Sequence, residues 1–330
     1  MSALKRFFTV YNCDCIYGAR KYLPDGSVDL IVTDPPYGIN GDRLHRHYNR
    51  NEEFVIGDYV EISKEKYAGF TDHWIRQAER VLRPGGSIYI VSGYTNLADI
   101  LNALRKTSLK EVNHIIWKFR FGVFTKNKYI SSHYHILFYE KPGGNRTFNP
   151  ESRFGFNEKD ANRNSLNNTD REDVWLINRE YKPGRIKNKN ELPIALLTKI
   201  IQYSSNEGDL VCDFFLGGFS TAKVAIGLNR RIVGFEISRP VFIAKSAELE
   251  TIRPGSMICN LRKPNVYSQK NRGRSWSEEE YSALMDGYDQ LLSDGLPRYR
   301  IIALLEEQLG RGRWGIEKAL KKIGRGSSRR

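Results

Sequence analysis

Short apolar runs alternate along most of the chain with longer segments in which apolar residues recur at helical spacing. Runs with the length and β-branched character of buried strands lie at 28–33, 87–91, 209–213 and 231–236, with two further strands near 112–118 and 134–140. Helical spacing is found at about 70–82, 96–106, 192–203, 221–228 and 240–250. Strands that alternate with helices predict an α/β fold with a doubly wound, mainly parallel sheet covered by helices on both faces.

Two stretches interrupt this alternation. Between 142 and 190 the apolar periodicity disappears and Asn, Arg, Lys, Gly and Asp dominate, and a loop this long is usually functional. Residues 254–275, rich in Pro, Arg, Lys, Asn and Ser, predict a linker, and 276–330 then predict a small all-α domain with a basic tail. The predicted domains are therefore 1–253, which contains the insertion, and 276–330.

The net charge of the chain indicates the kind of molecule that it binds. Lys and Arg total 52 against 38 Asp and Glu, a net charge of +14 that suits a polyanion such as nucleic acid. No apolar run approaches the roughly 18 residues of a membrane span, and the N-terminus does not have the pattern of a signal peptide. We therefore expect no membrane partner and a cytoplasmic protein, nucleoid-associated if prokaryotic. The cysteines form no C-x-x-C pair and the two H-x-H pairs lack a third ligand, so no metal is expected.

The sharpest chemical motif is Asp34-Pro35-Pro36-Tyr37, directly after the predicted strand 28–33. Doubly wound sheets place ligands outside the carboxyl ends of their strands. The Asp34 carboxylate and the Pro35 carbonyl are two acceptors that can hold the N–H bonds of a base amine, and proline rigidity keeps the carbonyl aimed. The Tyr37 ring can stack on an extruded base. The plain alternative is a tight turn after a strand.

A second group of residues follows the strands of the later half of the chain. Asp213 ends the strand 209–213, and Phe215, Gly217 and Gly218 form the turn before the next helix. Glycines let the backbone approach a ligand where a side chain would obstruct it. Glu236, at the end of the next strand, is placed to accept both hydroxyls of a ribose. The alternative is an ordinary strand–helix connection.

Several motifs together resemble those of a known family. Residues 25–38 resemble the catalytic motif of the DNA amino-methyltransferases, and 208–218 resemble their S-adenosylmethionine-binding motif. The catalytic motif comes first, which is the order of the permuted beta class, and 81–87 and 173–175 are also similar to that class. The resemblance covers about 9–252. It implies a Rossmann-like methyltransferase domain, S-adenosyl-L-methionine as methyl donor without a metal, and a cofactor-side role for Asp14.

The resemblance implies a site-specific enzyme that methylates the exocyclic amine of a flipped adenine in double-stranded DNA. Adenine is favoured because the cytosine enzymes of the family more often have Ser before Pro-Pro-Tyr. Cytosine N4 and an RNA base remain alternatives. A DNA-binding regulator with a decayed catalytic domain is another, because Phe219 stands where the family usually has glycine and 191–193 read Glu-Leu-Pro where Lys-Pro is common. The class also leaves open a homodimer and a restriction endonuclease partner.

Three regions are expected to contact DNA. The first follows the catalytic motif and mixes cations with an aromatic ring: Arg43, Arg46, Tyr48 and Arg50. The second, 142–190, matches the target-recognition region of the beta class in location. The third, 276–323, resembles a Myb/SANT-like or helix-turn-helix module whose basic residues include Arg311, Arg313, Lys318, Lys321 and Lys322. The alternatives are a solvated loop for the first and a protein-binding bundle for the third.

Overall fold

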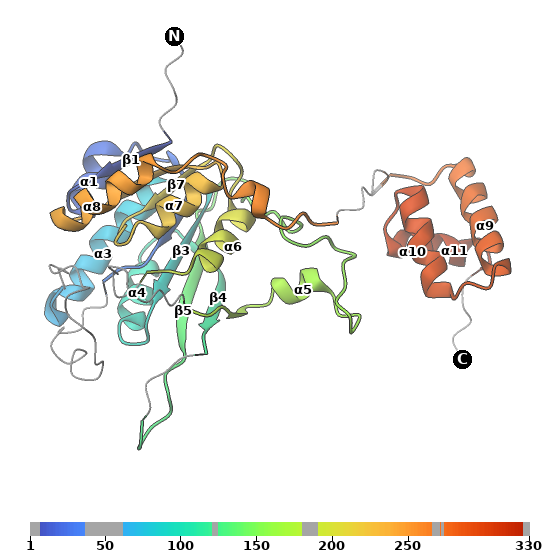
Figure 1. Cartoon of the computed structure of the whole chain (residues 1–330), viewed down its shortest axis with the longest axis horizontal. Helices are drawn as coiled ribbons and strands as arrows, with labels where there is room; N and C mark the ends of the chain where they lie inside the picture. The colour runs from blue at the N-terminus through green and yellow to red at the C-terminus, as the bar shows by residue number, and fades with distance from the viewer. Residues whose placement is uncertain are drawn as a thin grey trace, which may run out of the picture. The chain divides into compact units, whose positions relative to one another are not determined.

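The computed structural model describes residues 7–36, 62–120, 125–179, 191–265, 271 and 274–325 (Figure 1). The chain forms two compact units. The first comprises Met1–Arg153 and Asn167–Lys263, and the second comprises Phe154–Leu166 and Pro264–Arg330. Part of the predicted insertion 142–190 therefore belongs to the same unit as the C-terminal helices.

The first unit is built on a sheet of eight strands in the order β1-β8-β7-β2-β3-β5-β4-β6. The strands are β1 (Phe8–Tyr11), β2 (Val28–Thr33), β3 (Leu82–Ser92), β4 (Lys110–Lys118), β5 (His133–Glu140), β6 (Val174–Leu176), β7 (Leu210–Asp213) and β8 (Arg231–Phe235). β5 is antiparallel to both of its neighbours, and the remaining pairs are parallel. The mainly parallel, doubly wound sheet is confirmed.

Helices cover both faces of this sheet (Figure 1). One face packs against α1 (Cys15–Tyr22), α3 (Lys64–Val81) and α4 (Leu97–Leu104), and the other against α6 (Ile194–Ser204), α7 (Ser220–Gly227) and α8 (Arg239–Glu250). Successive side chains of a strand point to opposite faces, so Leu30 faces the second group of helices and Ile31 the first. Because both faces are buried, β2 reads as a continuous apolar run rather than an alternating one.

The parallel arrangement gathers the carboxyl ends of β1, β8, β7, β2, β3 and β4 at one edge of the sheet, here called the carboxyl edge. The registers show this directly, since Thr33 pairs with Ile90 near the end of β3, and Ser92 pairs with His135 at the start of β5. Lys118, the last residue of β4, lies opposite the first residue of β5. Loops that leave this edge are therefore neighbours in space.

Some local predictions differ from the structure. The first strand and helix, β1 and α1, were not predicted because four residues of β1 are too few to show a period. The strand predicted at 87–91 begins earlier, because residues 83–86 also lie within β3, where Gly85 has a φ of +75° and the pairing with β2 shifts register. The stretch 142–190, expected to be irregular, contains α5 (Leu166–Asp170) and the edge strand β6.

The second unit contains α9 (Glu278–Ser293), α10 (Arg298–Leu309) and α11 (Arg313–Lys322) around its own apolar core, which confirms a small all-α unit. Ser277 and Glu280 form a capping box at the start of α9, and Gly310 ends α10 in the left-handed conformation. Arg163 lies over the ring of Tyr299 at 5.1 Å, which joins 154–166 to this unit. The short helix η2 (Ile258–Asn260) precedes the linker. Among the described residues, no helix has the length and apolar content that a membrane span requires.

Candidate active site

The Asp34-Pro35-Pro36 segment leaves β2 at the carboxyl edge, as the sequence predicts. Pro35 is buried, and Asp34 and Pro36 are partly buried. The hydroxyl of Thr33, the last residue of β2, donates to Oδ1 of Asp213 at 2.9 Å, and both residues are buried. The ends of β2 and β7 are thereby tied together. Tyr37 lies outside the described residues.

One polar residue near Asp34, Tyr67, was not found from the sequence. Tyr67 on α3 is 1% exposed and hydrogen-bonded to the side chain of Asn96, which precedes α4. Burial raises the pKa of Tyr67 to about 12, and the negative charge of Asp34 adds to the rise. Tyr67 is therefore a neutral phenol at neutral pH. Its proximity to Asp34 depends on the packing of α3 against the sheet, which no local motif reports.

Asp213 organises the turn after β7. Its Oδ1 also accepts a hydrogen bond from the backbone N–H of Phe215 at 3.0 Å, and the ring of Phe215 packs edge-on against Trp74 at 5.4 Å. Burial raises the pKa of Asp213 to about 6, against the opposing effect of hydrogen bonds from Thr221, the Phe215 N–H and Thr33. A carboxyl group whose pKa is strongly raised by burial is typical of functional sites.

The glycine-rich turn after β7 contains two residues in the left-handed backbone conformation. Gly217 has a φ of +48°, and Phe219, two residues later, has a φ of +61°. Phe219 thus adopts the conformation that a glycine would supply at this position, and its fully buried ring packs near Phe242. A Cβ on Gly218 would lie 2.5 Å from a carboxylate oxygen of Glu191, so the backbone here is closely approached. The replacement of the family glycine by Phe219 keeps a left-handed residue in the turn.

Glu236 joins the turn after β7 to the loop after β8. Its Oε2 accepts from the N–H of Gly217 at 2.8 Å, and its Oε1 accepts from the N–H of Ser238 at 2.7 Å. Burial raises the pKa of Glu236, and the backbone N–H groups of Ser238, Gly217 and Ile237 oppose the rise. A carboxylate has about four acceptor positions, so with three N–H partners it can still accept a hydrogen bond from a ribose hydroxyl.

Asp14 is the N-cap residue of α1. Its Oδ1 accepts hydrogen bonds from the N–H groups of Ile16 and Tyr17 at 3.0 and 2.9 Å. It follows β1, the neighbour of β8, and Asn12 nearby donates to the backbone carbonyl of Glu236 at 2.8 Å. The N-terminal acid thus lies at the carboxyl edge, while its closest partners are the amides of its own helix.

Three of the predicted site residues lie on consecutive strand ends. Asp34 follows β2, Asp213 ends β7 and Glu236 follows β8, and these strands are neighbours in the order β8-β7-β2. Two strand spacings separate the first from the last, about 10 Å. One cofactor and one base can therefore be served at this edge. The described parts of the chain contain no cluster of His, Cys, Asp or Glu placed to hold a metal ion.

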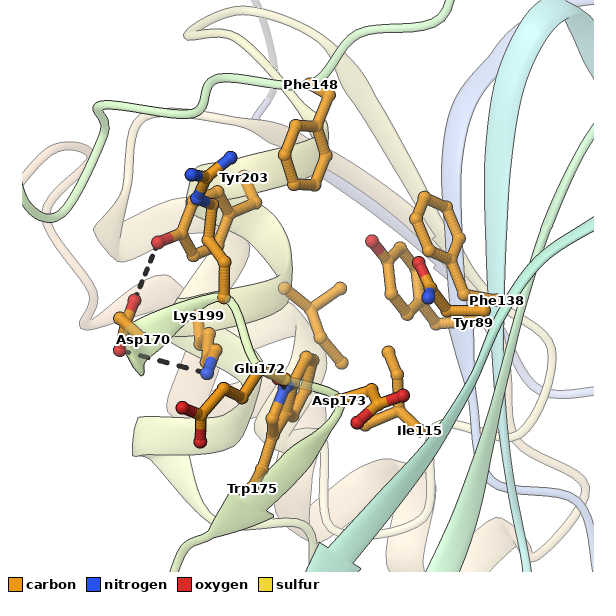
Figure 2. Close-up of a pocket in the computed structure, with 13 residues that line it drawn as sticks. Tyr89, Ile115, Phe138, Phe148, Asp170, Glu172, Asp173, Trp175, Lys199 and Tyr203 are labelled. Carbon is orange, nitrogen blue, oxygen red and sulfur yellow. Dashed lines mark hydrogen bonds and ion pairs between the residues drawn. The ribbon is translucent and has the colours of Figure 1, made fainter. Parts of the chain in front are cut away.

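A separate pocket opens between α6 and the strands β3, β4 and β5, and segment 170–175 closes it (Figure 2). Tyr203 donates to Asp170 at 2.7 Å, and Lys199 lies 3.8 Å from the same carboxylate and 4.4 Å from the ring centre of Trp175. Burial lowers the pKa of Lys199 to about 8. Arg153 also pairs with Asp170 at 2.8 Å. These contacts fasten segment 170–175 to α6, so Trp175 of the 173–175 motif serves packing.

The structure describes only some of the residues that the sequence predicts to contact DNA. Arg43, Arg46, Tyr48 and Arg50 lie outside the described residues. In the second unit, Arg311 is 4% exposed, donates to both carboxylate oxygens of Glu280 and to the Ser275 carbonyl, and lies 4.8 Å from the ring centre of Trp276. Its guanidinium is used within the unit, which corrects its assignment to DNA. The remaining cations predicted to contact DNA in this unit lie on α11 and are exposed: Arg313, Lys318, Lys321 and Lys322.

Comparisons with known proteins identify the family of the chain. The family described as N6_N4_Mtase, DNA methylase, matches residues 28–243. The chain is 32% identical over 247 residues to the type II methyltransferase M.BamHI of Bacillus amyloliquefaciens, covering 69% of this chain and 54% of that protein. It is 29% identical over 230 residues to the type II methyltransferase M.HpaI of Haemophilus parainfluenzae, covering 69% of each. The match thus spans about half the length of M.BamHI.

Two solved structures have the same fold. A DNA modification methylase of Thermus thermophilus, in complex with S-adenosyl-L-methionine, matches with a TM-score of 0.54 at 23% identity, over 75% of this chain and 95% of that chain. The cytosine-N4-specific PvuII DNA methyltransferase matches with a TM-score of 0.54 at 14% identity, over 78% and 94%. With the family match over residues 28–243, the conclusion is that this chain belongs to the N6/N4 DNA methylase family.

Proposed function

We propose that this protein is a DNA methyltransferase that transfers a methyl group from S-adenosyl-L-methionine to the exocyclic amine of an adenine in double-stranded DNA. The observation that supports this most is the position of Asp34, Asp213 and Glu236 on three neighbouring strand ends of one edge. Family membership supports the reaction class, and the motif order supports the beta class.

The residues around the turn after β7 fit the cofactor. S-adenosyl-L-methionine supplies an activated methyl group on a sulfonium. The left-handed turn at Gly217 and Phe219 exposes backbone to close approach, and Glu236 retains an acceptor position for a ribose hydroxyl. The solved Thermus methylase contains S-adenosyl-L-methionine on the same fold, which supports this assignment.

The residues at the end of β2 would act on the base. The Asp34 carboxylate accepts one N–H of the amine and the Pro35 carbonyl accepts the other, which draws nitrogen electron density toward the methyl donor. Proline rigidity keeps the second acceptor in place. Tyr67 is neutral and lies close enough to Asp34 for the charge of that carboxylate to raise the pKa of the phenol. The buried ring of Tyr67 helps to keep water from this side of the site. The main contribution of the protein is then alignment of the two reactants.

Adenine is proposed as the target because Asp precedes Pro-Pro-Tyr in this chain. The family includes enzymes for both amines, and the PvuII enzyme of similar fold is cytosine-N4-specific. The test is mass spectrometry of nucleosides from unmethylated genomic DNA and total RNA treated with the protein and isotopically labelled S-adenosyl-L-methionine. Labelled N6-methyladenine in DNA is expected. Label found only in N4-methylcytosine, or only in RNA, would contradict the adenine assignment.

A restriction endonuclease partner and a homodimer remain part of the proposal. The type II designation of M.BamHI and M.HpaI supports the first. If the protein protects DNA for such a partner, plasmid purified from cells that express it will resist one sequence-specific endonuclease and remain sensitive to others. Uniform sensitivity despite methylated adenine would remove the endonuclease from the proposal. Equilibrium sedimentation tests the homodimer, and a monomer at working concentration would exclude it.

A further inference from the structure

The connection between β4 and β5 leaves and re-enters the sheet at the carboxyl edge. Lys118 at the end of β4 pairs with His133 at the start of β5, on the edge where β2 ends at Thr33. The described part of this connection, drawn in green, extends away from the sheet (Figure 1). We call residues 125–132 the arm. Three strand spacings separate β4 from β2, about 14 Å, or about four phosphate steps along one DNA strand.

The charge of this region is of one sign. No acidic residue occurs between Lys118 and Glu140, whereas Arg120, Lys126 and Lys128 are cations. Lys126 and Lys128 are exposed on the arm, and the Thr125 hydroxyl donates to the Lys128 carbonyl, which closes the turn that presents them. A basic projection beside the proposed base site is complementary to the DNA backbone.

The arm also presents an aromatic ring. Tyr129 is 98% exposed and the neighbouring Ile130 is 48% exposed. A side chain with that exposure gains nothing from packing in the described fold. When a base is flipped out of a duplex, its neighbours lose a stacking partner and expose their faces. An exposed aromatic ring at this position can stack on such a face.

We propose that the arm binds duplex DNA beside the flipped base, with Lys126 and Lys128 on phosphates and the Tyr129 ring stacked on a base next to the vacated position. The inference rests on the proposed function, since it takes DNA as the substrate of the carboxyl edge. It adds a DNA-binding element to those predicted from the sequence, which lie at 43–50, 142–190 and 276–323.

The lysines are tested by salt dependence. The variant K126Q/K128Q is compared with R105Q/K110Q, which removes the same charge from exposed residues at the opposite end of the sheet. Affinity for a 30-base-pair duplex is measured across salt concentrations with the full chain. Loss of two phosphate contacts is expected to lower the magnitude of the salt slope by about 2 and the affinity at 0.1 M salt by about 60-fold. The control is expected to match the wild type in both.

The ring is tested by a pair of substitutions. Y129A is expected to lower kcat/KM for DNA by about 5-fold to 150-fold, the range for loss of one base–aromatic stack. Y129F keeps the face of the ring and is expected to stay within about twofold of the wild type. Calorimetry with S-adenosyl-L-methionine should give the same affinity for both variants and the wild type, because the arm lies outside the turn after β7.

The proposed DNA binding by the arm is refuted if K126Q/K128Q retains the wild-type affinity and salt slope. It is also refuted if R105Q/K110Q loses as much affinity and slope as K126Q/K128Q. The arm is refuted as a stacking element if Y129A and Y129F behave alike. A protein that docks on this surface instead of DNA would produce the first of these results. Failure of the proposed function looks different, because the wild type itself would then transfer no methyl group, while the binding comparison between the two lysine variants could still be read.

Discussion

Replacing Asp213 by asparagine should stabilise the folded protein at neutral pH. Asp213 is 3% exposed, and burial raises its pKa from 3.8 to about 6. A raised carboxyl pKa means that the folded state prefers the protonated form. The associated stability is fully present below pH 3.8 and is lost as the pH rises through about 6. At 1.36 kcal/mol per pKa unit, the ionised carboxylate destabilises the fold by about 3 kcal/mol at pH 7 and above.

Asparagine removes that charge and can keep the hydrogen bonds from Thr33 and Phe215. The donors from Thr33 and Phe215 both reach Oδ1, which an amide oxygen can replace. Urea denaturation of the wild type and Asp213→Asn should therefore differ by about 3 kcal/mol in favour of the variant above pH 7, with the difference shrinking toward zero by about pH 4. Circular dichroism checks that the fold is unchanged. A variant that is less stable by the same amount at every pH would refute the reasoning.

Four further outcomes are expected. Glu236→Gln should weaken S-adenosyl-L-methionine binding at least about tenfold in calorimetry, since hydrogen bonds to a charged acceptor are worth about 1.5–3 kcal/mol, and unchanged affinity would remove Glu236 from the cofactor site. Phe219→Gly should relieve about 1 kcal/mol of backbone strain but lose about 3–5 kcal/mol of buried ring, so urea unfolding should show net destabilisation, and a more stable variant would contradict this. Arg311→Ala should lower the Tm of the second unit, because it removes a buried guanidinium that pairs with the partly exposed Glu280 carboxylate and donates to the Ser275 carbonyl. Lys318→Gln with Lys321→Gln should leave that Tm unchanged while lowering the DNA salt slope by about 2, and an unchanged slope would count against DNA binding by α11.

The sheet could be predicted from the sequence because most of its strands are buried on both faces. In β2 every position but Asp29 is buried, so the apolar run is unambiguous, and the following helices show their period over 8 to 18 residues. The predicted strand 87–91 left out the start of β3 because Gly85 and Gly86 carry the local signal of a turn, and the sequence does not show which strands pair. The pairing of β3 with both β2 and β5 overrides that signal. A strand as short as β6 is likewise fixed by its partner β4 rather than by its own residues.

The site could be predicted where a residue follows a strand. Asp34, Asp213 and Glu236 were all identified from that position, because parallel strands bring their carboxyl ends together. Tyr67 could not be, since it reaches Asp34 only through the packing of its helix. Arg311 was misassigned because its partner Glu280 is 31 residues away, and an ion pair between them leaves no trace in local composition. The arm has no motif, and only its exposure and its place at the carboxyl edge show what it can contact.

The central claim is that the carboxylate of Asp34 holds the amine of the target base opposite the methyl donor. The most direct measurement is the rate of methyl transfer to unmethylated DNA by the wild type and by Asp34→Ala, with S-adenosyl-L-methionine affinity measured on the same samples. We expect wild-type label in N6-methyladenine, a rate at least about 100-fold lower for the variant, and equal cofactor affinity. A variant that binds the cofactor normally and still methylates DNA at close to the wild-type rate would contradict the claim.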